Sequence, residues 1–405
     1  MHHNTATYAS EAKLGIQLTK RVQSIKPSPT LAVTQKAQEL RAQGKDIIGL
    51  GAGEPDFDTP EHIKEAARQA LKEGKTKYTA VDGTPGLKAA VIEKFAEFNG
   101  LQFANDQVIV STGGKQCIYN LLQAVIEAGD EVIIPAPYWV SYPDMVLLAD
   151  GSPVIVDTSM EDDFKITPDK LRAAITPKTK LFIINSPSNP TGFTYSEQEL
   201  KALSTVLLEN PHVYIATDDM YEHILWEKSF YNIPMVCPEL LERTIVLSGV
   251  SKAYSMTGWR IGYAGGPADI IKPMKKIQGQ STSGACSISQ AAAEAALKGD
   301  LSDVDKMVTE FKKRHDFVVD QLCAMNGVTC KPADGTFYAF ANAQEAISNL
   351  KLKNDVALAE YLINEAGVAV VPGSAFGAEG YMRLSYAVGM DVLKEATKRL
   401  KEVFN

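Results

Sequence analysis

Seven short runs of apolar residues, each five or six residues long, recur between positions 107 and 265 of the 405-residue sequence. Runs that are apolar throughout are typical of strands buried on both faces of a sheet. Helix-like segments alternate with them, which favours an α/β fold with a mostly parallel, seven-stranded sheet. The expected strands are 107–111, 131–135, 153–157, 180–185, 213–217, 244–248 and 261–265.

Three segments have the pattern of amphipathic helices. The first is 61–73, which Thr59 is expected to cap, and the second is 115–127. The third, 303–323, opens a stretch of different character, because the segments TFYAFA, GVAVVP and YMRLSYA follow it. These predict the strands of a smaller α+β domain.

Three parts of the chain are therefore expected. Residues 1–60 form an N-terminal arm and part of the small domain, with the first 25 residues as the arm or a loosely held helix. Residues 61–298 form the large, ligand-binding domain, and residues 299–405 form the small C-terminal domain.

Composition excludes several classes of protein. The net charge is −8, so the sequence lacks the basic character of nucleic-acid-binding proteins. No apolar run approaches the ~20 residues that a membrane span needs. The five cysteines are scattered, without a CxxC pair, and the six histidines show no metal-ligand spacing. We expect a cytoplasmic protein with reduced thiols, without a metal, a membrane or a nucleic acid as partner.

Lys252 is the most unusual charged residue. It follows the apolar run 244–248 within the segment SGVSKAYSMTGWRIG, and Arg260 lies eight residues further on. A partly desolvated lysine beside a second cation loses its proton readily and becomes a nucleophile toward carbonyl groups. The alternative is an ordinary loop lysine that reaches solvent.

Two further polar segments follow expected strands, where open α/β sheets bind ligands. NSPSNPTG places the amide of Asn189 after one strand, although an ordinary proline-rich turn has the same composition. Asp218 ends another strand, where a buried carboxylate requires a positive partner. Alternatively, Asp218 caps the next helix, a role that Asp219 can also fill.

Two glycine-containing turns suggest close approach of the backbone to a ligand. In STGGKQ, Gly113 and Gly114 open a helix, and free amides at a helix N-terminus bind phosphate. The alternative is a simple tight turn. The segment GLGAGEPDF has GxGxG spacing, not the GxGxxG of dinucleotide-binding proteins. Its glycines, Gly53 among them, are interpreted as a backbone contact to substrate.

From about residue 20 to the C-terminus, the chain resembles the fold-type I pyridoxal-phosphate aminotransferases. Nine motifs occur in the order typical of that family, and together they are far more specific than any one alone. They are AGEPDF, KYT, GGK, PYW, SPSNPTG, DDMYE, SKxxxxxGxR, GTFYAF and RLSYA. The resemblance is closest to the bacterial aspartate aminotransferases, some of which also accept prephenate.

The resemblance implies a role for each matching residue toward pyridoxal phosphate. Lys252 would hold the cofactor and carry the proton, and Asp218 would keep the pyridine nitrogen protonated. The other cofactor contacts would be Asn189 and Tyr221 to the ring oxygen, Trp139 stacked on the ring, and Arg260, Ser251, Gly113, Gly114 and Lys115 at the phosphate. Gly249 replaces a phosphate-binding serine found in part of the family, so Ser248 or Ser251 is expected to compensate.

The resemblance also implies how the substrate is held and how subunits combine. Arg383 would grip the substrate α-carboxylate, with help from the Gly53 backbone, Trp139 and Asn189. Lys115 and Lys26 would bind a side-chain carboxylate. Tyr78 would reach the phosphate of a neighbouring subunit, which implies a homodimer with shared active sites.

The expected reaction is ping-pong transfer of the amino group between L-aspartate and 2-oxoglutarate. Alternatives on the same scaffold are aminotransferases for prephenate, aromatic amino acids or alanine, and pyridoxal-phosphate lyases. A ligand-sensing regulator would need a DNA-binding domain before residue 20. A nicotinamide oxidoreductase would need the dinucleotide fingerprint, which is missing.

Overall fold

The computed structural model describes residues 17–405. The expectation of an N-terminal arm falls mostly on residues outside this range. Two helices open the described chain, α1 (Lys20–Ser24) and α2 (Pro29–Ala42). Pro29 suits the first turn of α2, because proline lacks the N–H that would have no partner there.

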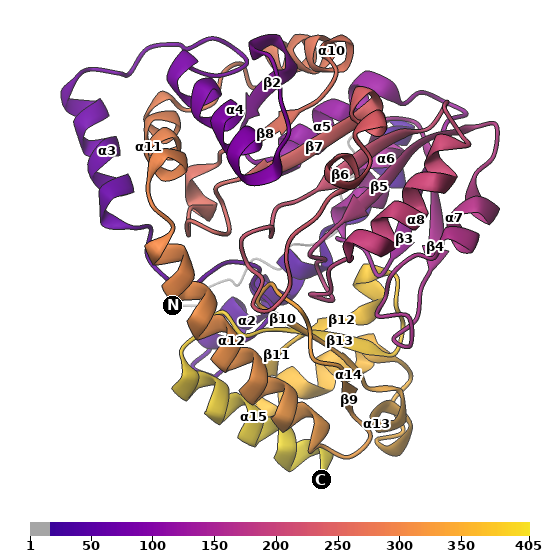
Figure 1. Cartoon of the computed structure of the whole chain (residues 1–405). Coiled ribbons are helices and arrows are strands. Elements are labelled where there is room, and N and C mark those ends of the chain that lie inside the picture. Colours follow the sequence, from indigo (N-terminus) through magenta and orange to yellow (C-terminus); the bar gives the residue numbers. More distant parts are fainter. Residues whose placement is uncertain (1–16) are drawn as a thin grey trace.

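A seven-stranded sheet forms the centre of the large upper part of the molecule (Figure 1). Only β8 runs antiparallel to its neighbours, and all other pairs are parallel. Each expected strand is present within one or two residues, which confirms the α/β fold class. In spatial order the strands are β2 (Val108–Ser111), β8 (Gly262–Gly265), β7 (Thr244–Gly249), β6 (Tyr214–Asp218), β5 (Thr179–Asn185), β3 (Glu131–Ala136) and β4 (Ser152–Asp157).

Helices cover both faces of this sheet, as its apolar strands require. The expected helices at 61–73 and 115–127 correspond to α3 and α5. Thr59 does not cap α3, because its hydroxyl donates instead to the Ser255 carbonyl oxygen at 2.6 Å. The helices are α3 (Glu61–Lys72), α4 (Pro85–Asn99), α5 (Gly114–Val125), α6 (Ser141–Leu148), α7 (Pro168–Ala174), α8 (Glu197–Leu208), α9 (Ile233–Val236), α10 (Ala268–Gly279) and α11 (Ser287–Lys298).

The chain from α12 to the C-terminus forms most of the smaller lower part in Figure 1. A four-stranded antiparallel sheet, in the order β12-β13-β10-β9, packs against the long helix α12 and the final helix α15. The elements are α12 (Ser302–Cys323), β9 (Thr329–Cys330), β10 (Tyr338–Asn342), α13 (Gln344–Asn349), α14 (Asp355–Tyr361), β11 (Val368–Ala369), β12 (Val371–Pro372), β13 (Tyr381–Ser385) and α15 (Met390–Phe404).

Both ends of the described chain contribute to this lower part. The short strand β1 (Ile48–Gly49) pairs in parallel with β11, and Ala37 and Leu40 of α2 pack against Ala369. The boundaries expected after residues 60 and 298 stay predictions.

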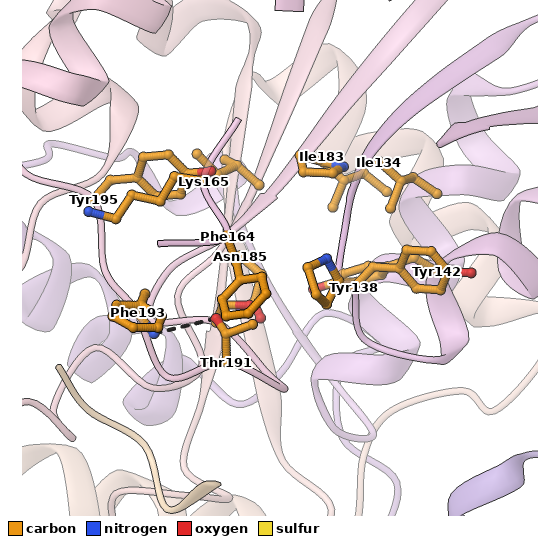
Figure 2. Close-up of a pocket in the computed structure, with 14 residues that line it drawn as sticks. Ile134, Tyr138, Tyr142, Phe164, Lys165, Ile183, Asn185, Thr191, Phe193 and Tyr195 are labelled. Atoms are coloured by element: carbon orange, nitrogen blue, oxygen red, sulfur yellow. Dashed lines mark hydrogen bonds between the residues drawn. The ribbon is translucent and has the colours of Figure 1, made fainter. Parts of the chain in front are cut away.

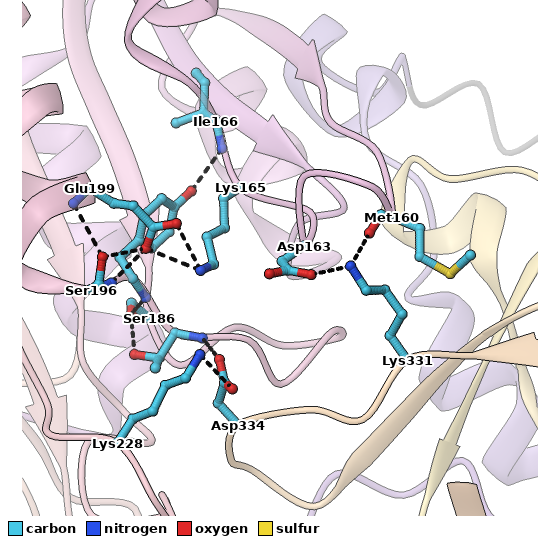
Figure 3. Close-up of polar contacts among 12 residues, drawn as sticks. Met160, Asp163, Lys165, Ile166, Ser186, Ser196, Glu199, Lys228, Lys331 and Asp334 are labelled. Atoms are coloured by element: carbon cyan, nitrogen blue, oxygen red, sulfur yellow. Dashed lines mark hydrogen bonds and ion pairs between the residues drawn. The ribbon is translucent and has the colours of Figure 1, made fainter.

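Polar contacts join the two parts (Figure 3). The Lys331 ammonium, from the lower part, donates to the Met160 carbonyl at 2.9 Å and pairs with Asp163. Asp334 accepts from the Thr194 backbone N–H at 3.0 Å and pairs with Lys228 at 2.8 Å. Within residues 17–405, no helix has both the length and the apolar character needed to cross a bilayer.

Candidate active site

A cavity of about 460 Å³ lies where the carboxyl ends of β5, β6 and β7 meet the lower part of the molecule. Open α/β sheets bind ligands at this edge because the loops after neighbouring parallel strands converge there. The cavity brings together most of the residues that the sequence singled out: Gly53, Gly114, Lys115, Trp139, Asn189, Asp218, Tyr221, Ser251, Lys252, Arg260 and Arg383.

Lys252 lies in the turn after β7, with one side facing the cavity. Its ammonium donates to the Gly53 carbonyl oxygen at 2.5 Å. Burial lowers the pKa of Lys252 to about 8; the Arg383 and Arg260 charges act in the same direction, while Glu54 and Asp218 oppose them. The neutral amine, which is the nucleophilic form, is therefore accessible near neutral pH.

Asp218 is buried at the end of β6. Its carboxylate accepts the Tyr142 hydroxyl at 2.5 Å and the Met220 backbone N–H at 3.3 Å. Burial raises the pKa of Asp218, although these two hydrogen bonds and Lys252 oppose that shift. Among the described residues, no cation lies within ion-pair distance of this carboxylate, so it can accept a cationic ligand group.

Neither Asp218 nor Asp219 caps a helix, so the capping alternative is wrong. Asp219 accepts instead from the Thr217 hydroxyl and, at 2.7 Å, from the Asn232 amide. Tyr221, three residues beyond Asp218, lies at the cavity with its hydroxyl 2.9 Å from that of Tyr338.

Arg383 is the buried cation of the opposite wall. It lies on β13, 2% exposed, with the Tyr338 and Phe376 rings against its guanidinium. Its two terminal nitrogens donate to the Asn189 amide oxygen at 2.9 Å and to the Gly51 carbonyl oxygen at 2.7 Å. Its Nε has no hydrogen-bond partner within residues 17–405. A buried guanidinium without a carboxylate partner is suited to binding one from a ligand.

A second cationic region lies at the N-terminus of α5. Gly113 has a φ of +87°, a conformation that favours glycine, and its backbone lies close to the Arg260 guanidinium. The Lys115 ammonium lies 5.0 Å from the centre of the Trp139 ring. Desolvation lowers the pKa of Lys115, as does Arg260. Two cations at a helix N-terminus suit a phosphate or a carboxylate.

Four expected site residues are not among those that line this cavity. Gly113 is one of them, although the next residue, Gly114, lines it. The buried Ser248 hydroxyl donates to Glu222 at 2.6 Å, behind the site, so Ser251 is the serine that faces the cavity. Lys26 lines a neighbouring cavity of about 480 Å³, which shares Lys115 and Arg260 with the first. Tyr78 is 99% exposed.

A family model described as aminotransferase class I and II matches residues 45–400, almost the whole described chain. The chain belongs to this family. The aminotransferase motifs AGEPDF and RLSYA, near opposite ends of the chain, meet in this cavity through Gly53 and Arg383.

Similar proteins match almost the whole of this aminotransferase. The aspartate/prephenate aminotransferase of Nitrosomonas europaea is 57% identical over 397 residues, which is 96% of this chain and 100% of that protein. The protein of the same name from Cereibacter sphaeroides is 53% identical over 95% of this chain and 98% of its own length.

Solved structures of aspartate aminotransferases share the fold. That from Rhizobium meliloti is 46% identical with a TM-score of 0.93, and the match covers 96% of this chain and 99% of that one. That from Thermus thermophilus with maleate is 44% identical with a TM-score of 0.91, covering 96% and 100%.

The structure adds two tyrosines to this aminotransferase site that the sequence motifs did not single out. Tyr338 contacts both Tyr221 and Arg383, and a Cβ on Gly53 would lie 2.7 Å from its hydroxyl. Tyr142 bonds to Asp218. Tyr338 lies within the motif GTFYAF, which could have indicated it, whereas Tyr142 follows PYW by three positions and gave no signal of its own.

Proposed function

We propose that this aminotransferase binds pyridoxal phosphate and transfers the amino group between L-aspartate and 2-oxoglutarate by a ping-pong mechanism. The observation that carries the proposal is the shared cavity of Lys252, Asp218 and Arg383. These supply an amine that readily loses its proton, a buried carboxylate without a cationic partner, and a buried guanidinium with a free donor. The names of the relatives support aspartate as the amino donor.

The donor set fits pyridoxal phosphate. Asp218 suits the protonated ring nitrogen, and Lys252 suits the aldehyde carbon. The α5 N-terminus, with Gly113, Ser251 and Arg260, suits the phosphate, because free amides and a guanidinium favour a doubly charged anion. The remaining contacts proposed for the ring are Trp139 on its face, Asn189 and Tyr221 at its oxygen, and Gly114 and Lys115 near the phosphate.

Bound pyridoxal phosphate supplies an aldehyde that accepts the amino group and a ring that withdraws electrons from the substrate Cα. Asp218 holds the proton at the ring nitrogen and so maintains that withdrawal. Arg383 orients the substrate through its α-carboxylate, and the Gly53 carbonyl lies beside the Lys252 amine. The neutral Lys252 amine would accept the proton from the substrate Cα and give it back later in the transfer, so Lys252 would be the proton carrier.

A dicarboxylate substrate needs a second cation, and Lys115 meets this need best. Its ammonium lies on the cavity wall beside Trp139, whereas Lys26 is exposed and lines the neighbouring cavity. The Thermus thermophilus enzyme was solved with maleate, a dicarboxylate. We therefore assign Lys115 as the residue that binds the side-chain carboxylate. Lys26 lines only the neighbouring cavity, so we give it no part in binding that carboxylate.

Prephenate is the second candidate acceptor, because relatives more than 50% identical are named for both aspartate and prephenate. Prephenate is a larger 2-oxo acid than 2-oxoglutarate. The cavity of about 480 Å³ beside the main one offers room for its additional bulk.

The proposal includes a homodimer with shared active sites. The Tyr78 side chain is almost fully exposed and does not line the cavity of its own chain. This position supports a contact between Tyr78 and the phosphate bound by a second subunit. Leu31 is 68% exposed, yet it lines the cavity, as expected if a second chain covers this side.

Replacement of Lys252 tests the proposal. Lys252→Ala removes the proton carrier and the amine that captures the aldehyde, so turnover of aspartate with 2-oxoglutarate is expected to fall by at least ~1,000-fold. Steady-state rates with saturating cofactor would measure this, with Lys228→Ala, at the surface, as the control. Near-normal turnover in Lys252→Ala would overturn the assignment of Lys252 as the proton carrier.

A further inference from the structure

Tyr142 lies beneath the active-site cavity, outside the set of residues so far given a role. It is in the first turn of α6 and is 2% exposed. Its hydroxyl donates to the Asp218 Oδ2 atom at 2.5 Å, which is in the short range typical of hydrogen bonds to an ionised oxygen.

The direction of this hydrogen bond is determined by the two groups. Burial and the negative charge of Asp218 raise the pKa of Tyr142 well above its ordinary value, so the phenol keeps its proton and donates it. At Asp218, the Tyr142 hydrogen bond is the strongest influence that opposes protonation of the carboxylate, followed by the Met220 N–H and the charge of Lys252. Tyr142 therefore favours the ionised form of Asp218.

The ring of Tyr142 has little freedom to move. It makes an edge contact with Trp139, with ring centres 5.3 Å apart, and packs in the core formed by β3, β5 and α5. On its other side lies an internal cavity of only about 20 Å³, lined by Ile134 and Ile183 (Figure 2). Figure 2 shows the Tyr142 hydroxyl pointing away from the other labelled residues. The hydroxyl is thus held at a fixed position relative to the Asp218 carboxylate.

We propose that Tyr142 is a positioning residue for Asp218, whose hydroxyl fixes the carboxylate and keeps it ionised so that it holds the proton of the cofactor's ring nitrogen. This inference rests on the proposed function, because it concerns the carboxylate assigned to that nitrogen. Tyr142 acts only through Asp218 and the Trp139 ring, and it does not line the main cavity. Loss of the Tyr142 hydroxyl should therefore weaken electron withdrawal by the cofactor ring, while the residues that contact the substrate stay in place.

The chain offers a closely matched control in Tyr195. Both tyrosines are buried, and both line the small cavity of Figure 2. The Tyr195 hydroxyl accepts the Ile166 backbone N–H at 3.0 Å instead of contacting Asp218. Tyr142→Phe and Tyr195→Phe therefore each remove one buried, hydrogen-bonded phenol oxygen, but only the first affects the active-site carboxylate.

The test uses holoenzyme loaded with pyridoxal phosphate carrying ¹⁵N in its ring, whose ¹⁵N chemical shift reports protonation of that nitrogen. In Tyr142→Phe we expect the signal to move toward that of an unprotonated ring. We also expect kcat to fall about tenfold with little change in KM, since a hydrogen bond to a charged group typically contributes this much. Tyr195→Phe should keep the native signal and kcat even if its thermal stability falls.

The outcomes separate this inference from the proposed function. A native ¹⁵N signal with kcat within twofold of wild type in Tyr142→Phe would overturn the inference and leave the proposed function intact. Equal changes in the two variants would overturn it too, because they would indicate a purely structural effect. Wild-type protein that binds no pyridoxal phosphate would overturn both.

Discussion

Lys115 carries the proposed recognition of the substrate side chain. Its ammonium lies over Trp139 and near Arg260 on the cavity wall. In Lys115→Ala we expect KM for aspartate to rise by about tenfold or more, the typical effect of losing a charged hydrogen-bond partner. Alanine, which has no side-chain carboxylate, should show a much smaller rise. Steady-state kinetics with both amino donors at saturating cofactor measure the difference, and an equal rise for both would contradict this role.

The sequence indicated the position of site residues that follow strands, because parallel strands bring their carboxyl ends to one edge. Lys252, Asp218 and Asn189 were found in this way. The orientation of a side chain was not predictable. Ser248 and Ser251 are only three positions apart in the sequence. The structure shows that Ser248 donates a hydrogen bond to Glu222, whereas Ser251 lines the cavity.

A buried ion pair links three elements behind the active site. The Lys94 ammonium from α4 contacts the Glu222 carboxylate in the turn after β6, and both side chains are at most 5% exposed. Asn99 and Ser248 also hydrogen-bond to Glu222, with Ser248 on β7. Because the Glu222 turn also carries Tyr221, the pair holds that turn against α4 and β7.

Loss of one partner from this pair should destabilise the fold strongly. Glu222→Gln leaves the Lys94 charge buried without a counter-charge, at a cost of about 3–5 kcal/mol in the free energy of unfolding. The double variant Lys94→Met/Glu222→Gln should recover much of this loss. Denaturant unfolding of the three proteins measures the coupling. Additive effects of the two substitutions would contradict the interpretation.

Elements with strong local patterns were the most predictable. The seven apolar runs correspond to the seven strands, since a strand buried on both faces leaves a continuous run in the sequence. The order of the strands was not indicated, nor was the antiparallel direction of β8. Thr59 was misassigned because the hydroxyl found a tertiary acceptor in Ser255, which local sequence does not reveal.

The proposed homodimer predicts that two inactive variants can complement each other. In a mixed dimer of Lys252→Ala and Tyr78→Ala, one site receives both substitutions, and the other keeps Lys252 and the partner subunit's Tyr78. After subunit exchange, an equal mixture should reach roughly a quarter of wild-type activity, because half of the dimers are mixed and each has one intact site.

The separate variants provide the reference for this measurement. If each chain used its own Tyr78, the mixture would show only the average activity of the two variants. That result would contradict shared active sites. The same samples, examined by sedimentation, would give the number of chains in the assembly.

The reaction of the whole holoenzyme with L-aspartate alone would show whether this protein carries out the proposed transamination. No oxo acid is added, so only the first half of the ping-pong cycle can proceed. We expect rapid loss of the bound cofactor's absorption band, with release of one oxaloacetate per active site. A band that persists with aspartate but is lost with another amino acid would contradict the assigned substrate, and the absence of any cofactor band would contradict the mechanism itself.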